Sequence, residues 1–162
     1  MKRRLCVQWG LVTGVVLLGG CASVPSGSGL PHHWAGRLVL QIQDGPEQRH
    51  SGGFELHGSP TEGELNLFNP LGTTVAQARW TPNLAQLQQG QNIQWFDTPS
   101  ALVHAATGAD LPLEALFDWL KGIPTSAAGW QVDLAQYTQG RIRAQRSQPT
   151  PAVQLLIVLQ QP

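Results

Sequence analysis

The side chains that could do chemistry are few and scattered along the chain. The sequence has five histidines: His32, His33, His50, His57 and His104. None has the H-E-x-x-H spacing of a zinc-binding helix, and the adjacent pair His32–His33 is typical of a solvated segment. Glu62 and Glu64, near a turn, are typical of a solvated pair. There is no G-x-S-x-G nucleophile motif and no glycine-rich phosphate loop. The sequence therefore predicts no catalytic residues, no metal and no cofactor.

Cys21 is the one residue set in a pattern with a specific chemistry. Residues 2–4 are basic, residues 5–20 form an apolar run, and Leu18-Gly-Gly precedes the cysteine. A helix of this run would span about 24 Å, short of a hydrocarbon core of about 30 Å, so a signal peptide is favoured over a membrane span. The small residues before Cys21 resemble the lipobox of bacterial lipoproteins. That resemblance implies removal of residues 1–20 and acylation of Cys21 by a diacylglycerol and an amide-linked chain.

The segment after Cys21 predicts a tether. Three acyl chains anchor a protein stably, and residues 22–33, rich in Ser, Gly and Pro, would reach up to about 40 Å fully extended. By the lipobox resemblance, Ala22 rather than aspartate after the cysteine is consistent with the outer membrane. We therefore divide the chain into a signal peptide (1–20), an acylated flexible tether (21–33) and one folded domain (34–162).

Charge argues against nucleic acid as a partner. The chain has ten basic and ten acidic residues. Since residues 2–4 supply three of the basic ones, the mature chain has seven against ten, a net charge of −3. It offers no basic patch of the kind that binds nucleic acid. Cys6 is lost with the signal and Cys21 is acylated, so stability must come from a core, which about 140 residues suffice to bury.

Most of the domain has the period-two alternation of half-buried strands. It runs from Trp34 to Ile42, through Phe54 and Leu56, and through two strands on either side of Asn69-Pro-Leu-Gly72. Turn signals recur roughly every ten residues, which favours an antiparallel meander over parallel units. Residues 152–159 are almost continuously apolar and predict a strand apolar on both faces or partly covered by a helix.

Two helices are predicted between the strands. Thr98-Pro99 is a capped helix start, with the helix over residues 100–106 and Gly108 ending it. A second helix begins at Pro112 and runs to about Lys121. It carries one apolar stripe at i, i+3, i+4 and i+7: Leu113, Leu116, Phe117 and Leu120. Trp119 lies off that stripe and broadens the apolar surface.

Leu71 is an unusual residue for a turn. Pro70 fixes φ and Gly72 accepts a conformation that other residues avoid, so Asn69-Pro-Leu-Gly72 reads as a turn. A turn tip is normally polar and wet. Leu71 either folds back onto the core or projects into a membrane or a protein partner.

Five segments carry a family resemblance: Trp34-Ala-Gly-Arg37, Ser51-Gly-Gly-Phe54, Leu67-Phe-Asn-Pro-Leu-Gly-Thr73, Thr107-Gly-Ala-Asp-Leu-Pro-Leu113 and Trp119-Leu-Lys-Gly-Ile-Pro124. On these motifs the chain resembles the LolB family of outer-membrane lipoprotein receptors, in a short form. It departs from longer members around residues 123–130 and before Trp34.

The resemblance implies a mainly β fold: an incomplete antiparallel barrel, or half-barrel, with a helical lid enclosing a hydrophobic cavity. It implies that a monomer takes acylated cargo lipoproteins from a soluble LolA-like periplasmic carrier. It then inserts them into the inner leaflet of the outer membrane without nucleotide. The exposed hydrophobic loop of the family falls on Leu71, with Asn69, Pro70 and Gly72 around it.

Fourteen apolar side chains are predicted to line the acyl cavity: Leu38, Leu40, Phe54, Leu56, Leu65, Leu67, Trp80, Leu113, Leu116, Phe117, Trp119, Leu120, Leu155 and Ile157. The alternative is that the same residues fill a dry core. The protein would then be a structural outer-membrane lipoprotein whose sheet docks another protein.

Overall fold

The computed structural model describes residues 32–43 and 48–160. The predicted signal peptide, Cys21 and all but the last two residues of the tether lie outside the described residues. The strands are β1 (His33–Ile42), β2 (Gln48–Gly58), β3 (Gly63–Phe68), β4 (Thr74–Thr81), β5 (Leu84–Gln89), β6 (Asn92–Phe96), β7 (Trp130–Asp133), β8 (Arg141–Arg146) and β9 (Val153–Leu159). The helices are α1 (Pro99–Thr107) and α2 (Leu113–Leu120), with a single 3₁₀ turn at Tyr137–Gln139.

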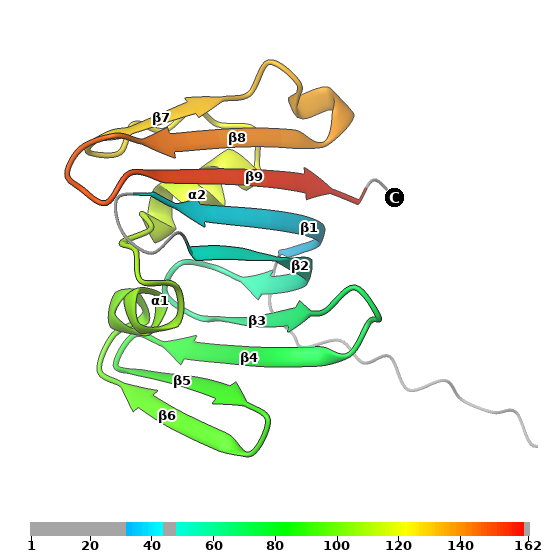
Figure 1. Ribbon diagram of the computed structural model, residues 1–162, viewed down its shortest axis with the longest axis vertical. Helices are drawn as coiled ribbons and strands as arrows, with labels where there is room; N and C mark the ends of the chain where they lie inside the picture. The colour runs from blue at the N-terminus through cyan, green and yellow to red at the C-terminus, as the bar shows by residue number, and fades with distance from the viewer. Residues whose placement is uncertain (1–31, 44–47, 161–162) are drawn as a thin grey trace, which may run out of the picture.

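All the described strands belong to one antiparallel sheet. Its order is β6-β5-β4-β3-β2-β1-β9-β8-β7, so the sheet is open and not a closed barrel (Figure 1). The strands from β1 to β6 form the predicted meander, and β9 returns to pair with β1 from Gly36↔Leu159 to Ile42↔Val153. Within the described ranges, no helix has the length and hydrophobicity needed to cross a bilayer.

Both predicted helices form, and local chemistry sets the ends of α1. The Thr98 hydroxyl accepts a hydrogen bond from the Ala101 amide at 3.1 Å, which satisfies one of the free donors of the first turn. At the other end, Gly108 adopts φ 76° and donates to the His104 carbonyl. The α2 helix begins one residue after Pro112, and its C-terminal Leu120 carbonyl accepts from Trp34 Nε1 and Tyr137 Oη, each at 3.1 Å.

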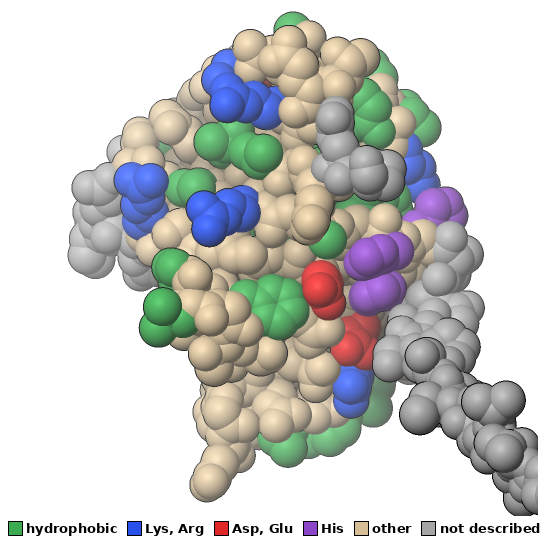
Figure 2. Space-filling view, turned by 90° about the vertical axis from the view of Figure 1, so that its right-hand side faces the viewer, with side chains coloured by type: hydrophobic (Ala, Val, Ile, Leu, Met, Phe, Trp, Pro, Cys, Tyr) green, Lys and Arg blue, Asp and Glu red, His purple; other side chains and the backbone are tan. Residues whose placement is uncertain are grey.

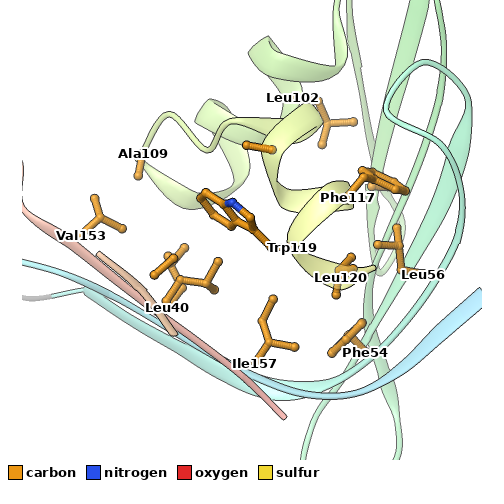
Figure 3. Close-up of a cluster of buried hydrophobic side chains, with 14 of the residues drawn as sticks. Leu40, Phe54, Leu56, Leu102, Ala109, Phe117, Trp119, Leu120, Val153 and Ile157 are labelled. Atoms are coloured by element: carbon orange, nitrogen blue, oxygen red, sulfur yellow. The ribbon is translucent and has the colours of Figure 1, made fainter. Parts of the chain in front are cut away.

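The core lies between the helices and one face of the sheet, here called the inner face. Phe117 of α2 is 1% exposed and meets Trp34 and Trp80 edge-on, with ring centroids 5.6 and 6.4 Å apart. Figure 3 shows the sheet curving beneath α2, with Leu40 and Ile157 directed from the strands toward the helix. The sheet and the helices therefore share one apolar interior.

Replacing Phe117 by alanine is expected to lower the free energy of unfolding by about 3–5 kcal/mol, because it removes a fully buried ring and leaves a cavity. Urea denaturation followed by circular dichroism measures the change. The matched control is Phe96→Ala, at a half-buried position on the edge strand β6, which should cost clearly less. Equal losses for the two variants would show that Phe117 is not central to the core.

The final strand agrees with its prediction. Residues 152–159 were predicted to be apolar on both faces or partly covered by a helix, and in β9 Val153, Leu155 and Ile157 are buried on the inner face while the apolar Val158, 36% exposed, lies on the other. The physical reason is that both helices cover the inner face alone. The opposite face, here called the outer face, keeps apolar side chains of β9 near solvent.

Candidate functional site

An apolar pocket of about 470 Å³ lies between the inner face and the two helices. Thirteen of the fourteen predicted cavity residues line it: Leu38, Leu40, Phe54, Leu56, Leu65, Leu67, Trp80, Leu113, Leu116, Phe117, Leu120, Leu155 and Ile157. They come from five strands and from α2, so residues far apart in the sequence meet around one space. The volume falls within the range of about 300–1,000 Å³ that is typical of small-ligand sites.

Trp119 is the exception among the fourteen, because it does not line this pocket. It is 1% exposed. Its ring packs against Trp130, with centroids 5.9 Å apart, and its Nε1 donates to the Thr125 carbonyl at 2.9 Å. The residue lies off the stripe of Phe117 and Leu120 on α2. It therefore fastens the chain after α2 to the core instead of widening the pocket.

The sequence reasoning missed the contribution of α1. Leu102, Val103 and Ala106 of this helix line the pocket, and so does Leu111 in the connection to α2. The signal was present, because positions 102, 103 and 106 fall on one side of a helix. It is weak because the helix is short and rich in alanine. Three lining residues of the strands were missed as well: Ala76 and Ala78 of β4, and Leu87 of β5.

The polar lining of the pocket gathers at one end of the sheet. Arg49 and His50, near the start of β2, are exposed and line the pocket, as does Gln89 at the end of β5. Phe68 at the end of β3 and Val75 at the start of β4 join them. The Asn69–Thr73 loop connects these last two strands, so the polar rim of the pocket and this loop occupy the same end of the sheet.

Leu71 projects from this loop and is 90% exposed, so the alternative in which it folds back onto the core is wrong. The Asn69 side chain holds the backbone: its Oδ1 accepts from the amides of Leu71 at 2.9 Å and Thr73 at 3.0 Å. Gly72 adopts φ 82° and donates to the Asn69 carbonyl at 2.9 Å. The loop is thus shaped by its own polar atoms, and it presents leucine without burying it.

Comparisons with known proteins agree with one another. A family model described as outer membrane lipoprotein LolB matches residues 32–154. The outer-membrane lipoprotein LolB of Bordetella petrii is 30% identical, over 90% of this chain and 88% of that protein. The protein of the same name from Vibrio cholerae is 30% identical over 75% of this chain and 65% of its own length. That of Photorhabdus laumondii is 33% identical over 56% of this chain and 44% of its own length.

Proposed function

Since the chain belongs to the LolB family of outer-membrane lipoproteins, we propose that it receives acylated lipoproteins from a soluble LolA-like carrier and inserts them into the inner leaflet of the outer membrane. Family membership makes it a lipid-anchored protein of the outer membrane that takes part in the localisation of lipoproteins. The receptor mechanism, the carrier, the monomeric state and the anchor at Cys21 are parts of the proposal.

The observation that carries the proposal is the apolar pocket whose polar rim shares one end of the sheet with the protruding Leu71 loop. A receptor for acyl chains needs a space that water does not fill and a short route from that space to lipid. The pocket and the loop supply these two features at neighbouring positions. An exposed leucine would also suit the docking alternative, so the apolar pocket is the feature that favours the receptor.

The free energy of exposing acyl chains to water limits how such cargo can move. Three acyl chains hold on the order of 45 methylenes, and exposing each to water costs about 0.8 kcal/mol, so free passage through water would cost tens of kcal/mol. Cargo must therefore pass directly from one apolar cavity to another. A difference in affinity between carrier, receptor and bilayer suffices to drive the passage, without nucleotide.

The pocket must also widen to take a whole cargo anchor. Each methylene takes up roughly the 30 Å³ of a liquid water, so three chains need on the order of 1,300 Å³, nearly three times the present volume of about 470 Å³. The Leu120 carbonyl of α2 is held by Trp34 and Tyr137. The short α1 makes no such bond to the inner face among the described residues, so we expect α1, not α2, to shift when the pocket widens.

Transfer from a loaded carrier tests this function. The non-acylated Cys21→Ala protein, mixed with carrier bound to acylated cargo, should remove the cargo, and a pull-down with the receptor measures it. Uptake of a fluorescent fatty acid separates the alternative, because a dry, filled core should exclude the probe. A protein that neither removes cargo nor takes up the probe would be the structural docking lipoprotein.

A further inference from the structure

Four arginines surround apolar side chains on the outer face of β2, β1, β9 and β8. This arginine patch consists of Arg37, Arg49, Arg141 and Arg143, all exposed, with Val39, Leu156 and Val158 among them. Figure 2 shows the basic side chains spread over the upper half of this face, with hydrophobic ones between them. The patch is on the opposite side of the sheet from the helices and belongs to no part of the pocket except at Arg49.

The strand register places cations on both sides of the apolar centre. Val158 of β9 lies between Arg37 of β1 and Arg141 of β8, in one row across the sheet. In the next row Leu156 lies between Val39 and Arg143. A hollow of about 560 Å³ opens here, lined by Arg49, Arg143, Val39 and Leu156, by one carboxylate, Asp133, and by the amide side chains Gln41, Gln131, Gln145 and Gln154. The surface is therefore concave, basic and partly apolar.

These arginines have no ion-pair partner among residues 32–43 and 48–160. Asp133 is opposite Arg143 in the register, but its carboxylate accepts from the Ala135 amide at 2.9 Å. Arg79, elsewhere on the outer face, shows the contrast: it pairs with Glu64 at 3.1 Å. Four arginines that form no ion pair within the described part of the chain, on one face of a mature chain of net charge −3, call for an anionic partner.

The arginine patch is continuous with the Leu71 loop. Arg37 pairs across the strands with Gly53, and Gly53 with Phe68, the residue that leads into Asn69. A side-chain carbon on Gly53 would meet the Phe68 ring at 3.6 Å, so the ring lies over the glycine and joins the two surfaces. Arg49 lines both the hollow of the patch and the rim of the pocket. One connected surface thus runs from the loop to the arginines.

We propose that the arginine patch binds the phosphate headgroups of anionic phospholipids in the leaflet that the Leu71 loop reaches. The guanidinium group donates two parallel hydrogen bonds to a phosphate, and the apolar centre suits the glycerol and upper acyl region beneath it. The membrane contact rests on the proposed function. Binding here would turn the pocket rim toward the bilayer, because Arg49 belongs to both surfaces.

A fluorophore on the patch tests the proposal in the lipid-anchored protein. Cys6 lies in the signal and the Cys21 sulfur is acylated, so Val158→Cys provides a single free thiol for an environment-sensitive label. In vesicles of phosphatidylcholine with phosphatidylglycerol, the emission should shift to the blue, and high salt should reverse the shift. Each Arg→Gln change at 37, 141 or 143 should lower the ratio of patch-bound to unbound protein, read from the blue-shifted emission, about fivefold. This follows because an arginine near an anionic surface contributes about 1 kcal/mol.

Matched controls make the result specific. Arg79→Gln should leave the shift unchanged, since Glu64 already neutralises that arginine. Burial alone would raise the pKa of Glu64, but hydrogen bonds from Asn66, Arg79 and Gln77 and the charge of Arg79 outweigh it and lower the pKa. Glu64 therefore stays ionised at neutral pH. A label at Ala105→Cys, exposed on α1, should report no shift.

Three outcomes would overturn the proposal. The emission could be the same on phosphatidylcholine alone, inorganic phosphate without vesicles could give the shift, or the arginine changes could weaken carrier binding and leave the label unaffected. The last would make an acidic protein the partner. Cargo delivery is scored separately: a protein that shows the shift but delivers no cargo would refute the proposed function and leave the patch standing.

Discussion

Replacing Leu71 by glutamate should leave the protein folded and able to take up acylated cargo, while delivery of that cargo to membranes falls about ten- to hundredfold. The side chain is 90% exposed and the loop is shaped by Asn69 and Gly72, so folding loses nothing. Inserting a leucine into lipid is worth about 1.5–3 kcal/mol, and glutamate forfeits it. Transfer of labelled lipoprotein from the receptor to vesicles measures the effect.

The control for this change is Leu84→Glu. Leu84 is also an exposed apolar residue at the start of a strand next to a turn, 48% exposed on β5. Since it lies at another hairpin, delivery should remain at the unmodified level. If Leu71→Glu delivered cargo at the normal rate, or if both variants lost delivery equally, the loop would have no particular role in release.

Filling the pocket is the second change with a large expected effect. Ala106 of α1 is half-buried and lines the pocket, so Ala106→Trp should occupy much of the space of about 470 Å³. We expect binding of a fluorescent fatty acid, and of cargo from the carrier, to fall at least tenfold. The cost in folding should stay within the roughly 1–3 kcal/mol of an overpacked site. Fluorescence titration measures the binding, and urea denaturation the stability.

The neighbouring residue supplies the control. Ala105 is exposed and does not line the pocket, so Ala105→Trp adds the same ring to the same helix without filling the space. It should bind the probe normally. Normal binding by Ala106→Trp as well would mean that the acyl chains bind elsewhere, and the case for the pocket would fail.

Local patterns in the sequence predicted the secondary structure and most of the pocket. Alternation put Leu65 and Leu67 on one face of β3, and the helical stripe put Leu116 and Leu120 on one face of α2. These patterns work because the inner face of the sheet and the inner side of the helix must be apolar to be buried together.

What could not be predicted depends on contacts between distant segments. Trp119 was predicted to line the cavity, because the sequence around it does not show that its ring packs against Trp130. The grouping of the arginines into one patch could not be predicted for the same reason. Only the pairing of β1, β9 and β8 brings Arg37, Val158 and Arg141 into one row. The sequence also left open whether Leu71 points inward or outward, because that depends on the hydrogen bonds by which the Asn69 side chain shapes the loop.

The chain that covers the inner face, residues 97–129, has a mechanical consequence of its own. It leaves the sheet from β6 and rejoins it at β7, and these are the two outermost strands. It is therefore a strap fastened at both margins, and it cannot swing away on a single hinge. A shift of α1 within this strap pulls on both margins, so cargo binding and the curvature of the whole sheet should change together.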